Sequence, residues 1–345
     1  MTNTNINTPE PALDTPIPAL AEPAASLSVT LSSYLRAALY LLLLLTMLGF
    51  TGRLFWWADY FAHPRLHLAA LTGIAGLLLL LMRQWTSFLF ACVGIVFNIV
   101  AITSAISESP FIRNTNGVPP GELSVIQINV NSASPDNLAI SRFITASKPD
   151  ILILTGANKN WIQMLDGLVP ILQYQKIANH SGEYGSAILS RFPLDKVDIG
   201  TAGPRSLPVI KVELETEIGR IAVVSVHGDA PTSGNATHAR DHYFSQVSAM
   251  IQTDGLPTIV AGNFNATPWS SGYEALRLLP NLQPESIKVP PTWPAALGPL
   301  GLPTNNIMLS IPYKNQLPIE LEQLTAGPML PGLGHLPLIA HFKIR

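Results

Sequence analysis

The chain has 345 residues, of which 48% are hydrophobic and only 12% are charged, and its formal net charge at pH 7 is −2. This hydrophobic content is too high for a wholly soluble protein, so we expect part of the chain to lie in lipid. From about Gly117 onward no cluster of Lys and Arg stands out to neutralise nucleic-acid phosphates, so strong nucleic-acid binding is not expected.

The first 30 residues are rich in Pro, Thr, Ala and Asn and contain no Lys or Arg. They carry too little apolar surface to fold, so residues 1–30 are predicted to form a disordered tail. A cleaved signal peptide is not expected, because the leading segment lacks positive charge and several apolar stretches follow.

Residues 31–107 are predicted to form a membrane anchor. Its apolar stretches cover residues 37–52, 66–82 and 86–106, and each approaches the roughly 17–25 residues needed to cross a bilayer. The sequence therefore predicts three transmembrane helices. A buried helical bundle is the alternative, and continuous leucine runs such as 41–45 disfavour it, because they leave no polar face. The aromatic residues expected at headgroup depth are Trp56, Trp57, Tyr60, Phe61 and Trp85.

The orientation of this anchor is poorly determined by charge, because the arginines of the short loops divide almost evenly between the two sides. The only cysteine, Cys92, lies inside the third apolar stretch, so it gives no indication of the redox compartment.

Residues 108–119 are interpreted as a linker, and residues 120–345 as one α/β domain. In this domain short apolar runs alternate with polar connections, which predicts hairpins and helical crossovers. We expect two stacked, mostly antiparallel β-sheets flanked by helices, in a four-layer sandwich. The predicted strands are residues 123–130, 151–154, 186–190, 209–215, 220–226, 258–261, 306–311 and 336–343, and helices are predicted after 134–136 and over 158–172, 235–251 and 270–279.

Two stretches rich in Pro, Gly and Leu, residues 289–303 and 327–337, have no strand or helix periodicity. We interpret them as ordered surface loops near a site, because binding groups often lie on loops held by a rigid sheet.

Several short strings along this domain form an ordered set. They are Asn129 at a strand end, PDILIL (149–154), GSAILSRFPL (185–194), SVHGD (225–229), GNFNATPWSS (262–271), PTWP (291–294) and GHLPL (334–338). Together they make residues 120–345 resemble the endonuclease/exonuclease/phosphatase superfamily. With the anchor in front, the chain resembles its membrane-bound bacterial branch, which includes the vancomycin/teicoplanin-resistance-type proteins.

Members of this superfamily hydrolyse phosphate monoesters or diesters with Mg²⁺ or a similar ion, and the resemblance assigns roles to four residues. Asn129 would help to hold the metal or phosphate, and His227 would contact the phosphoryl group. Asn265 would orient the phosphate, and His335 would stabilise the charge that develops on it.

At four other positions the resemblance implies an acid that this chain lacks. The metal-binding glutamate would fall at Gly156, and the aspartate that positions the attacking water at Asn263. Further aspartates would fall at Asn305 and Gly334. Because Mg²⁺ is held mainly by carboxylate oxygens and an amide is no general base at neutral pH, the family's mechanism should not operate.

We therefore interpret the protein as a pseudoenzyme that needs no cofactor and binds a phosphorylated or anionic ligand or a protein partner. The expected partners are the lipid bilayer, a lipid-linked ligand and a membrane protein. The expected location is the bacterial inner membrane, in a multi-pass topology with an extracytoplasmic domain. A purely structural membrane subunit is a further possibility.

The alternative is an active phosphatase or phosphodiesterase that uses Mg²⁺ or Mn²⁺ in a rebuilt metal site. Asp229 and Glu183 are the acids that could join His227 in such a site. His238 and His242 are spaced to share a metal on one helix face, but that helix lacks the glutamate of zinc hydrolases, so a solvated face is the simpler interpretation.

Overall fold

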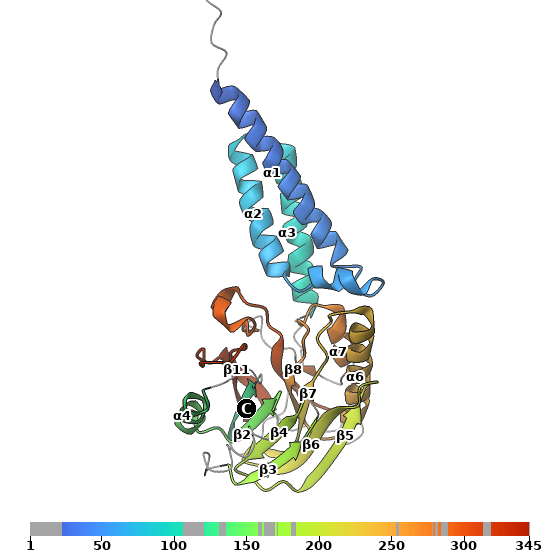
Figure 1. The fold of residues 1–345 in the computed structure, drawn as a ribbon, viewed down its shortest axis with the longest axis vertical. Coiled ribbons are helices and arrows are strands. Elements are labelled where there is room, and N and C mark those ends of the chain that lie inside the picture. The colour runs from blue at the N-terminus through green and yellow to red at the C-terminus, as the bar shows by residue number, and fades with distance from the viewer. Residues whose placement is uncertain are drawn as a thin grey trace, which may run out of the picture.

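The computed structural model describes a helical bundle followed by a layered α/β domain (Figure 1). The residues described are 23–105, 121–130, 136–157, 161, 170, 172–180, 184–252, 255–277, 279, 282–283, 289–312 and 319–344. The proposed linker at 108–119 and residues 1–22 of the predicted tail lie outside this part of the chain.

The bundle contains α1 (Pro23–Leu48), α2 (Arg65–Leu81) and α3 (Trp85–Ala105), with the short η1 (Trp56–Phe61) between α1 and α2. Because α1 begins at Pro23, residues 23–30 are helical rather than part of a disordered tail. Proline is well suited to a first helical turn, where its missing N–H would have no partner.

The prediction of three transmembrane helices is wrong by the criterion of length. Ser28–Leu48 and Trp85–Ala105, each 21 residues, are long and apolar enough to cross a membrane. Helix α2 has 17 residues, which at 1.5 Å per residue gives about 25 Å, less than the ~30 Å hydrocarbon core. In the described residues the bundle therefore holds two candidate spans, and α2, which lies between them in the sequence, packs at one side of the bundle (Figure 1).

The domain contains two six-stranded mixed sheets. The first has the order β11-β12-β1-β2-β4-β3 and the second the order β5-β6-β7-β8-β10-β9. Among the described strands only the β1–β2 and β7–β8 pairs are parallel. The strands are β1 (Glu122–Asn129), β2 (Ile151–Thr155), β3 (Tyr174–Ala178), β4 (Ser186–Ser190), β5 (Lys196–Ala202), β6 (Leu207–Thr216), β7 (Gly219–His227), β8 (Thr258–Asn263), β9 (Leu282–Gln283), β10 (Asn305–Ser310), β11 (Ile319–Ala326) and β12 (Leu338–Ile344).

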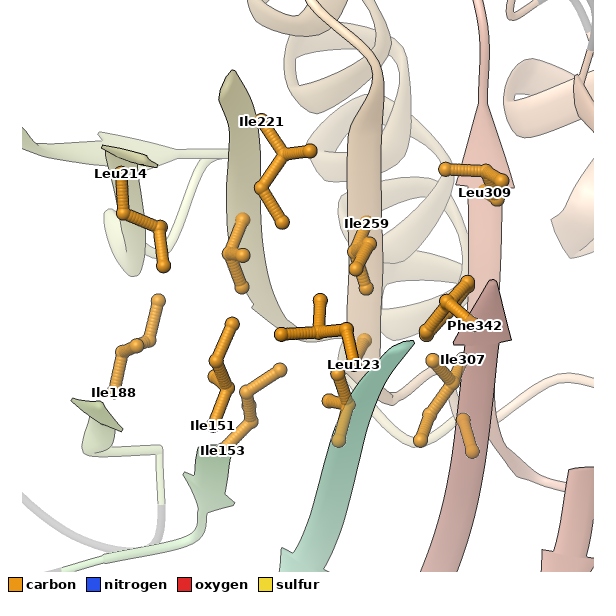
Figure 2. Packing of buried hydrophobic residues seen from close by; sticks show 14 of the residues in the cluster. Leu123, Ile151, Ile153, Ile188, Leu214, Ile221, Ile259, Ile307, Leu309 and Phe342 are labelled. Atoms are coloured by element: carbon orange, nitrogen blue, oxygen red, sulfur yellow. The ribbon is translucent and has the colours of Figure 1, made fainter. Parts of the chain in front are cut away.

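The core is built by strands whose successive side chains point to opposite faces of each sheet. In the first sheet Val125 faces the second sheet while Ile126 faces outward, and in the second sheet Val223 faces the first while Val224 faces outward. Successive residues of a strand point to opposite faces, so strands apolar at every position pack on both sides. Figure 2 shows the inner layer, where isoleucine and leucine side chains of the two sheets meet.

Helices cover the two outer faces. Helix α4 (Asn137–Ser147) lies on the first sheet, and its N-terminus is capped by Asp136, whose carboxylate accepts hydrogen bonds from two backbone N–H groups. Helix α6 (Gly234–Gln252) lies on the second sheet and packs Tyr243 and Phe244 against it. The expected α/β architecture of two stacked sheets flanked by helices is confirmed.

Some elements differ from the prediction in detail. The predicted helix at 270–279 is present as η2 (Ser271–Tyr273) and α7 (Glu274–Arg277). The predicted loop at 289–303 includes η3 (Ala295–Leu300). The helix predicted over 158–172 lies mostly outside the described residues.

The connection between α1 and α2 docks on the loop that follows β8. Ser271 donates its backbone N–H to Asp59 Oδ1 at 2.9 Å, and Trp269 Nε1 donates to the carbonyl of His63 at 3.1 Å. Both Asp59 and His63 are buried. The edge of the sheet where β8 ends therefore faces the helical bundle.

Candidate functional site

The strand ends bring most of the predicted site residues to one edge of the domain. Asn129 ends β1, beside Thr155 at the end of the parallel strand β2. In the second sheet His227 pairs with Asn263, and Asn263 pairs in turn with Asn305. Because parallel strands end at the same edge, residues from distant parts of the chain meet there.

A chain of hydrogen bonds between uncharged side chains joins the two sheets at this edge. Asn305 Nδ2 donates to Gln127 Oε1 at 3.0 Å, and Gln127 Nε2 donates to Thr155 Oγ1 at 3.1 Å. Thr155 Oγ1 in turn donates to Asn129 Oδ1 at 3.4 Å. All four side chains are buried, so each needs such a partner to offset the loss of water. This amide chain occupies the centre of the site.

The loop after β8 is held by its own asparagines. Asn265 donates its backbone N–H to Asn263 Oδ1 at 3.0 Å and its Nδ2 to the carbonyl of Gly228 at 2.8 Å. Asn265 has φ 47°, a left-handed conformation that asparagine tolerates better than most residues. Arg240 Nη1 donates to the carbonyl of Asn265 at 3.3 Å. Asn263 and Asn265 therefore stabilise this turn through their own hydrogen bonds.

His227 and His335 are both buried and are close enough to influence each other's charge. Burial lowers the pKa of His227 to about 3, with His335 and His180 adding to the effect. Burial likewise lowers the pKa of His335 to about 4. Both imidazoles are therefore neutral at pH 7, and the Nδ1 atom of each is buried without a hydrogen-bond partner.

The loop that carries His335 is tied to the amide chain through Thr292. Leu336 donates its backbone N–H to the carbonyl of Thr292 at 2.8 Å, and Asn305 donates its own to Thr292 Oγ1 at 3.1 Å. The rings of Trp293 and His335 lie 6.3 Å apart. The two loops expected near a site, 289–303 and 327–337, both lie beside it.

The two glycines at predicted acid positions differ in their surroundings. Gly156 has φ +77°, and a Cβ atom there would lie 2.8 Å from the carbonyl oxygen of Val130 and 2.9 Å from Asn129 Oδ1. At Gly334 a Cβ atom would meet no atom within 4 Å. The backbone at 156 therefore excludes a glutamate, whereas 334 has room for an aspartate.

Of the other acids and histidines that the sequence suggested, those that the structure describes do not gather into a metal site. Asp229 is buried and paired with Arg205, whose guanidinium also lies 4.8 Å over the Tyr184 ring. His238 and His242 are exposed on α6. Glu183 lies outside the described residues.

The donor set of the site does not fit Mg²⁺. Within the described ranges no group of three or more His, Cys, Asp or Glu residues lies together. The described strand-end residues Asn129, Thr155, His227, Asn263 and Asn305 offer amide, hydroxyl and neutral imidazole atoms, whereas Mg²⁺ is held by carboxylate oxygens that offset its charge.

Three residues of the site were missed from the sequence: Gln127, Thr155 and Thr292. Gln127 and Thr155 could have been predicted as site residues, because each is a polar residue next to buried apolar residues of its strand, where a polar side chain needs a hydrogen-bond partner. Thr292 lies in a loop without periodicity and carries no such signal.

Several solved structures share this fold. A humanized D. rerio TDP2 with 14 mutations has a TM-score of 0.54 at 15% identity, covering 64% of this chain and 98% of its own. A protein of unknown function from Enterococcus faecalis has a TM-score of 0.52 at 13% identity, covering 65% of this chain and all 100% of its own. An endonuclease/exonuclease/phosphatase from Bacteroides vulgatus has a TM-score of 0.51 at 15% identity, covering 65% and 99%.

No curated protein matches the chain. The family model described as Endonuclease/Exonuclease/phosphatase family matches residues 126–310, which is more than half of the chain and includes the amide chain, whereas β11, β12 and His335 lie beyond the match. By this match the protein belongs to the endonuclease/exonuclease/phosphatase family.

Proposed function

We propose that this protein is a membrane-attached family member that binds a phosphorylated or other anionic ligand without metal-dependent hydrolysis. The observation that carries this proposal is the amide chain from Asn305 through Gln127 and Thr155 to Asn129. Of the four positions where the family resemblance implies carboxylates, Asn305 belongs to this chain of hydrogen bonds and Asn263 accepts a backbone N–H. Gly156 and Gly334 have no side chain, so none of the four offers negative charge to a divalent cation.

Binding of an anion is supported by the unpartnered polar atoms at the same edge. His227 Nδ1 and His335 Nδ1 are buried without hydrogen-bond partners, and each donates to an anion when it carries the proton. Buried polar groups without partners are costly, so a ligand that satisfies them gains affinity. An anion would also favour the protonated imidazole, and would raise the depressed pKa values of His227 and His335 on binding.

Membrane attachment is supported by the outer surface of the bundle. Large apolar side chains of all three helices point outward, for example Leu41 at 55%, Ile74 at 58% and Val96 at 57% exposure. Soluble proteins rarely expose apolar surface in such a continuous belt, and lipid would cover it. We propose that α1 and α3 cross the bilayer and that the domain lies on the extracytoplasmic side, which reporter fusions at the C-terminus would test.

Calorimetry on the full chain in detergent tests the binding claim. We expect inorganic phosphate or a phosphomonoester to bind, with affinity rising as the pH falls from 7 to 5, since binding takes up protons on the histidines. His335→Gln should weaken the binding and flatten its pH dependence. Heat no different from dilution for every phosphorylated ligand would contradict the proposal.

An active phosphodiesterase is the second candidate, and the family match over residues 126–310, which includes Asn129, His227 and Asn305, supports it. Turnover dependent on added Mg²⁺ or Mn²⁺ is the property that separates the two candidates.

A further inference from the structure

A pocket apart from the candidate site lies where the helical bundle meets the domain. Its volume is about 160 Å³, many times the roughly 10–15 Å³ that holds one water. It is lined from the end of α1, the start of α2, the end of α3 and the loop after β8. None of its lining residues belongs to the amide chain or to the His227–His335 pair, so it is separate from the family site.

Arg65 is the unusual residue of this pocket. Its side chain is buried, with 2% exposure, and its Nε and Nη1 atoms have no hydrogen-bond partner. The guanidinium lies 4.1 Å from the centre of the Phe50 ring, a stacking contact that holds it in place without satisfying those donors. A buried guanidinium with unused N–H groups is costly unless an acceptor approaches it.

Two further arginines line the same pocket, Arg53 and Arg277. Arg277 Nη2 donates to the carbonyl of Ser270 at 3.3 Å, and Arg53 forms an exposed ion pair with Glu274. Among the described residues that line the pocket none is a carboxylate. The buried carboxylate of Asp59 accepts from Ser271 and lies 3.5 Å from Arg240. It also acts electrostatically on Arg65 and Arg277, so one carboxylate offsets only part of the arginine charge here. The pocket therefore carries an excess of positive charge.

We propose that this pocket binds a phosphate group, either in the headgroup of an anionic lipid or as a free anion. Arginine N–H groups in a fork match phosphate oxygens, and charge-assisted hydrogen bonds of this kind are among the strong ones. The pocket lies at the ends of the two candidate spans, α1 and α3, which is the depth at which lipid phosphates lie when the bundle is in a bilayer. Occupancy of the pocket would fix the bundle against the domain.

The test uses the full chain in detergent and measures bound lipid by native mass spectrometry. The probes are phosphatidylglycerol, phosphatidylcholine, which has the same phosphate beside a cation, and inorganic phosphate as a competitor. We expect phosphatidylglycerol to bind, and Arg65→Gln to weaken it roughly 10- to 100-fold, the loss of about two charge-assisted hydrogen bonds. Arg83→Gln, an exposed arginine at the opposite end of the bundle, is the matched control and should leave binding unchanged.

Two further variants distinguish loss of binding from misfolding, and this pocket from the family site. Arg65→Lys retains the charge and should fold, but it loses the planar fork, so its affinity should fall between those of wild type and Arg65→Gln. His335→Gln should not change phosphatidylglycerol binding, which separates this pocket from the family site. Binding of inorganic phosphate that Arg65→Gln weakens, without lipid binding, would assign the pocket to a free anion. Equal binding by wild type, Arg65→Gln and Arg65→Lys, or no binding of any probe, would overturn the proposal.

Discussion

Asp59 Oδ2 lies 3.5 Å from Arg240 Nη2, and both side chains are almost completely buried, at 1% and 0% exposure. Asp59 lies in the connection between α1 and α2, and Arg240 lies on α6. Since Arg240 Nη1 also donates to the carbonyl of Asn265, this ion pair links the helical bundle to the loop of the candidate site.

Removing Asp59 should loosen this link. Asp59→Asn leaves Arg240 with Asp241 as its remaining carboxylate partner. We expect the free energy of unfolding to fall by about 1–3 kcal/mol, because a buried charge loses one of its partners. Denaturant unfolding of the full chain in detergent measures this. Asp195→Asn, which breaks the exposed pair with Arg220, is the control and should change the free energy of unfolding much less.

His63 should make the junction sensitive to acid. Burial lowers its pKa to about 4, with Arg240 acting in the same direction and Asp59 against it, and its Nδ1 accepts a hydrogen bond from the backbone N–H of Thr267 at 3.4 Å. The unfolded chain takes up this proton first, near pH 6.5. The stability from neutral His63 is therefore complete above pH 6.5 and is lost as the pH falls toward 4, on the order of 3 kcal/mol in all.

The check on His63 compares the slope of Tm against pH between 6.5 and 4. His63→Gln should have a smaller slope than wild type, whereas His341→Gln, an exposed histidine on β12, should keep the wild-type slope. His227 and His335 titrate in the same sense, so some slope should persist in both variants. An unchanged slope in His63→Gln would show that this residue is already protonated or exposed.

Gly156 and Gly334 differ in the space around a Cβ atom, so the same substitution at each position should have different effects on stability. Gly156→Ala combines a left-handed backbone with contacts below 3 Å, so the free energy of unfolding should fall by about 1–3 kcal/mol. Gly334→Ala and Gly334→Asp enter open space and should stay within about 0.5 kcal/mol of wild type. Equal effects at the two positions would mean that the backbone at 156 relaxes freely. Restoring a glutamate at 156 should therefore fail without a change in backbone conformation.

Asn305→Asp tests the amide chain. An aspartate at 305 places a carboxylate oxygen against Gln127 Oε1, so the Gln127 amide must flip and then presents its oxygen to Thr155. The Thr155 hydroxyl must turn to donate to that oxygen, and its bond to Asn129 is lost. We expect a loss of about 1–3 kcal/mol at pH 8. Burial should raise the pKa of the new carboxyl, so the loss should shrink as the pH falls and the group becomes neutral. Recovery of stability on adding Mg²⁺ would instead indicate a latent metal site.

The sequence predicted the central strands well because their physical signal is strong. β1, β2, β8 and β10 are buried on both faces, and their continuous apolar runs are hard to mistake. β3 and β5 lie at sheet edges and are largely exposed. Their polar residues and Gly200 interrupt the apolar pattern, so the sequence did not predict these two strands. The apolar stretch of α2 was located correctly, but its helix is too short for the span assigned to it.

The site was predicted only in part. The ordered motifs predicted Asn129, His227, Asn263, Asn305 and His335 as site residues. The structure places them at one edge of the domain, and their roles stay a prediction. The contacts between them depend on tertiary pairing that no local pattern encodes: the bond from Gln127 to Asn305 crosses between the sheets, and Arg240 reaches Asp59 in the bundle. The left-handed backbone at Gly156 likewise depends on the neighbouring strand end.

The central claim is that the family site no longer supports metal-dependent hydrolysis. Its most direct test is the rate at which the purified full chain hydrolyses a chromogenic phosphomonoester and a chromogenic phosphodiester with Mg²⁺ or Mn²⁺ present. We predict a rate equal to that of buffer, for wild type and His335→Ala alike. Turnover in wild type that both EDTA and His335→Ala abolish would contradict the claim.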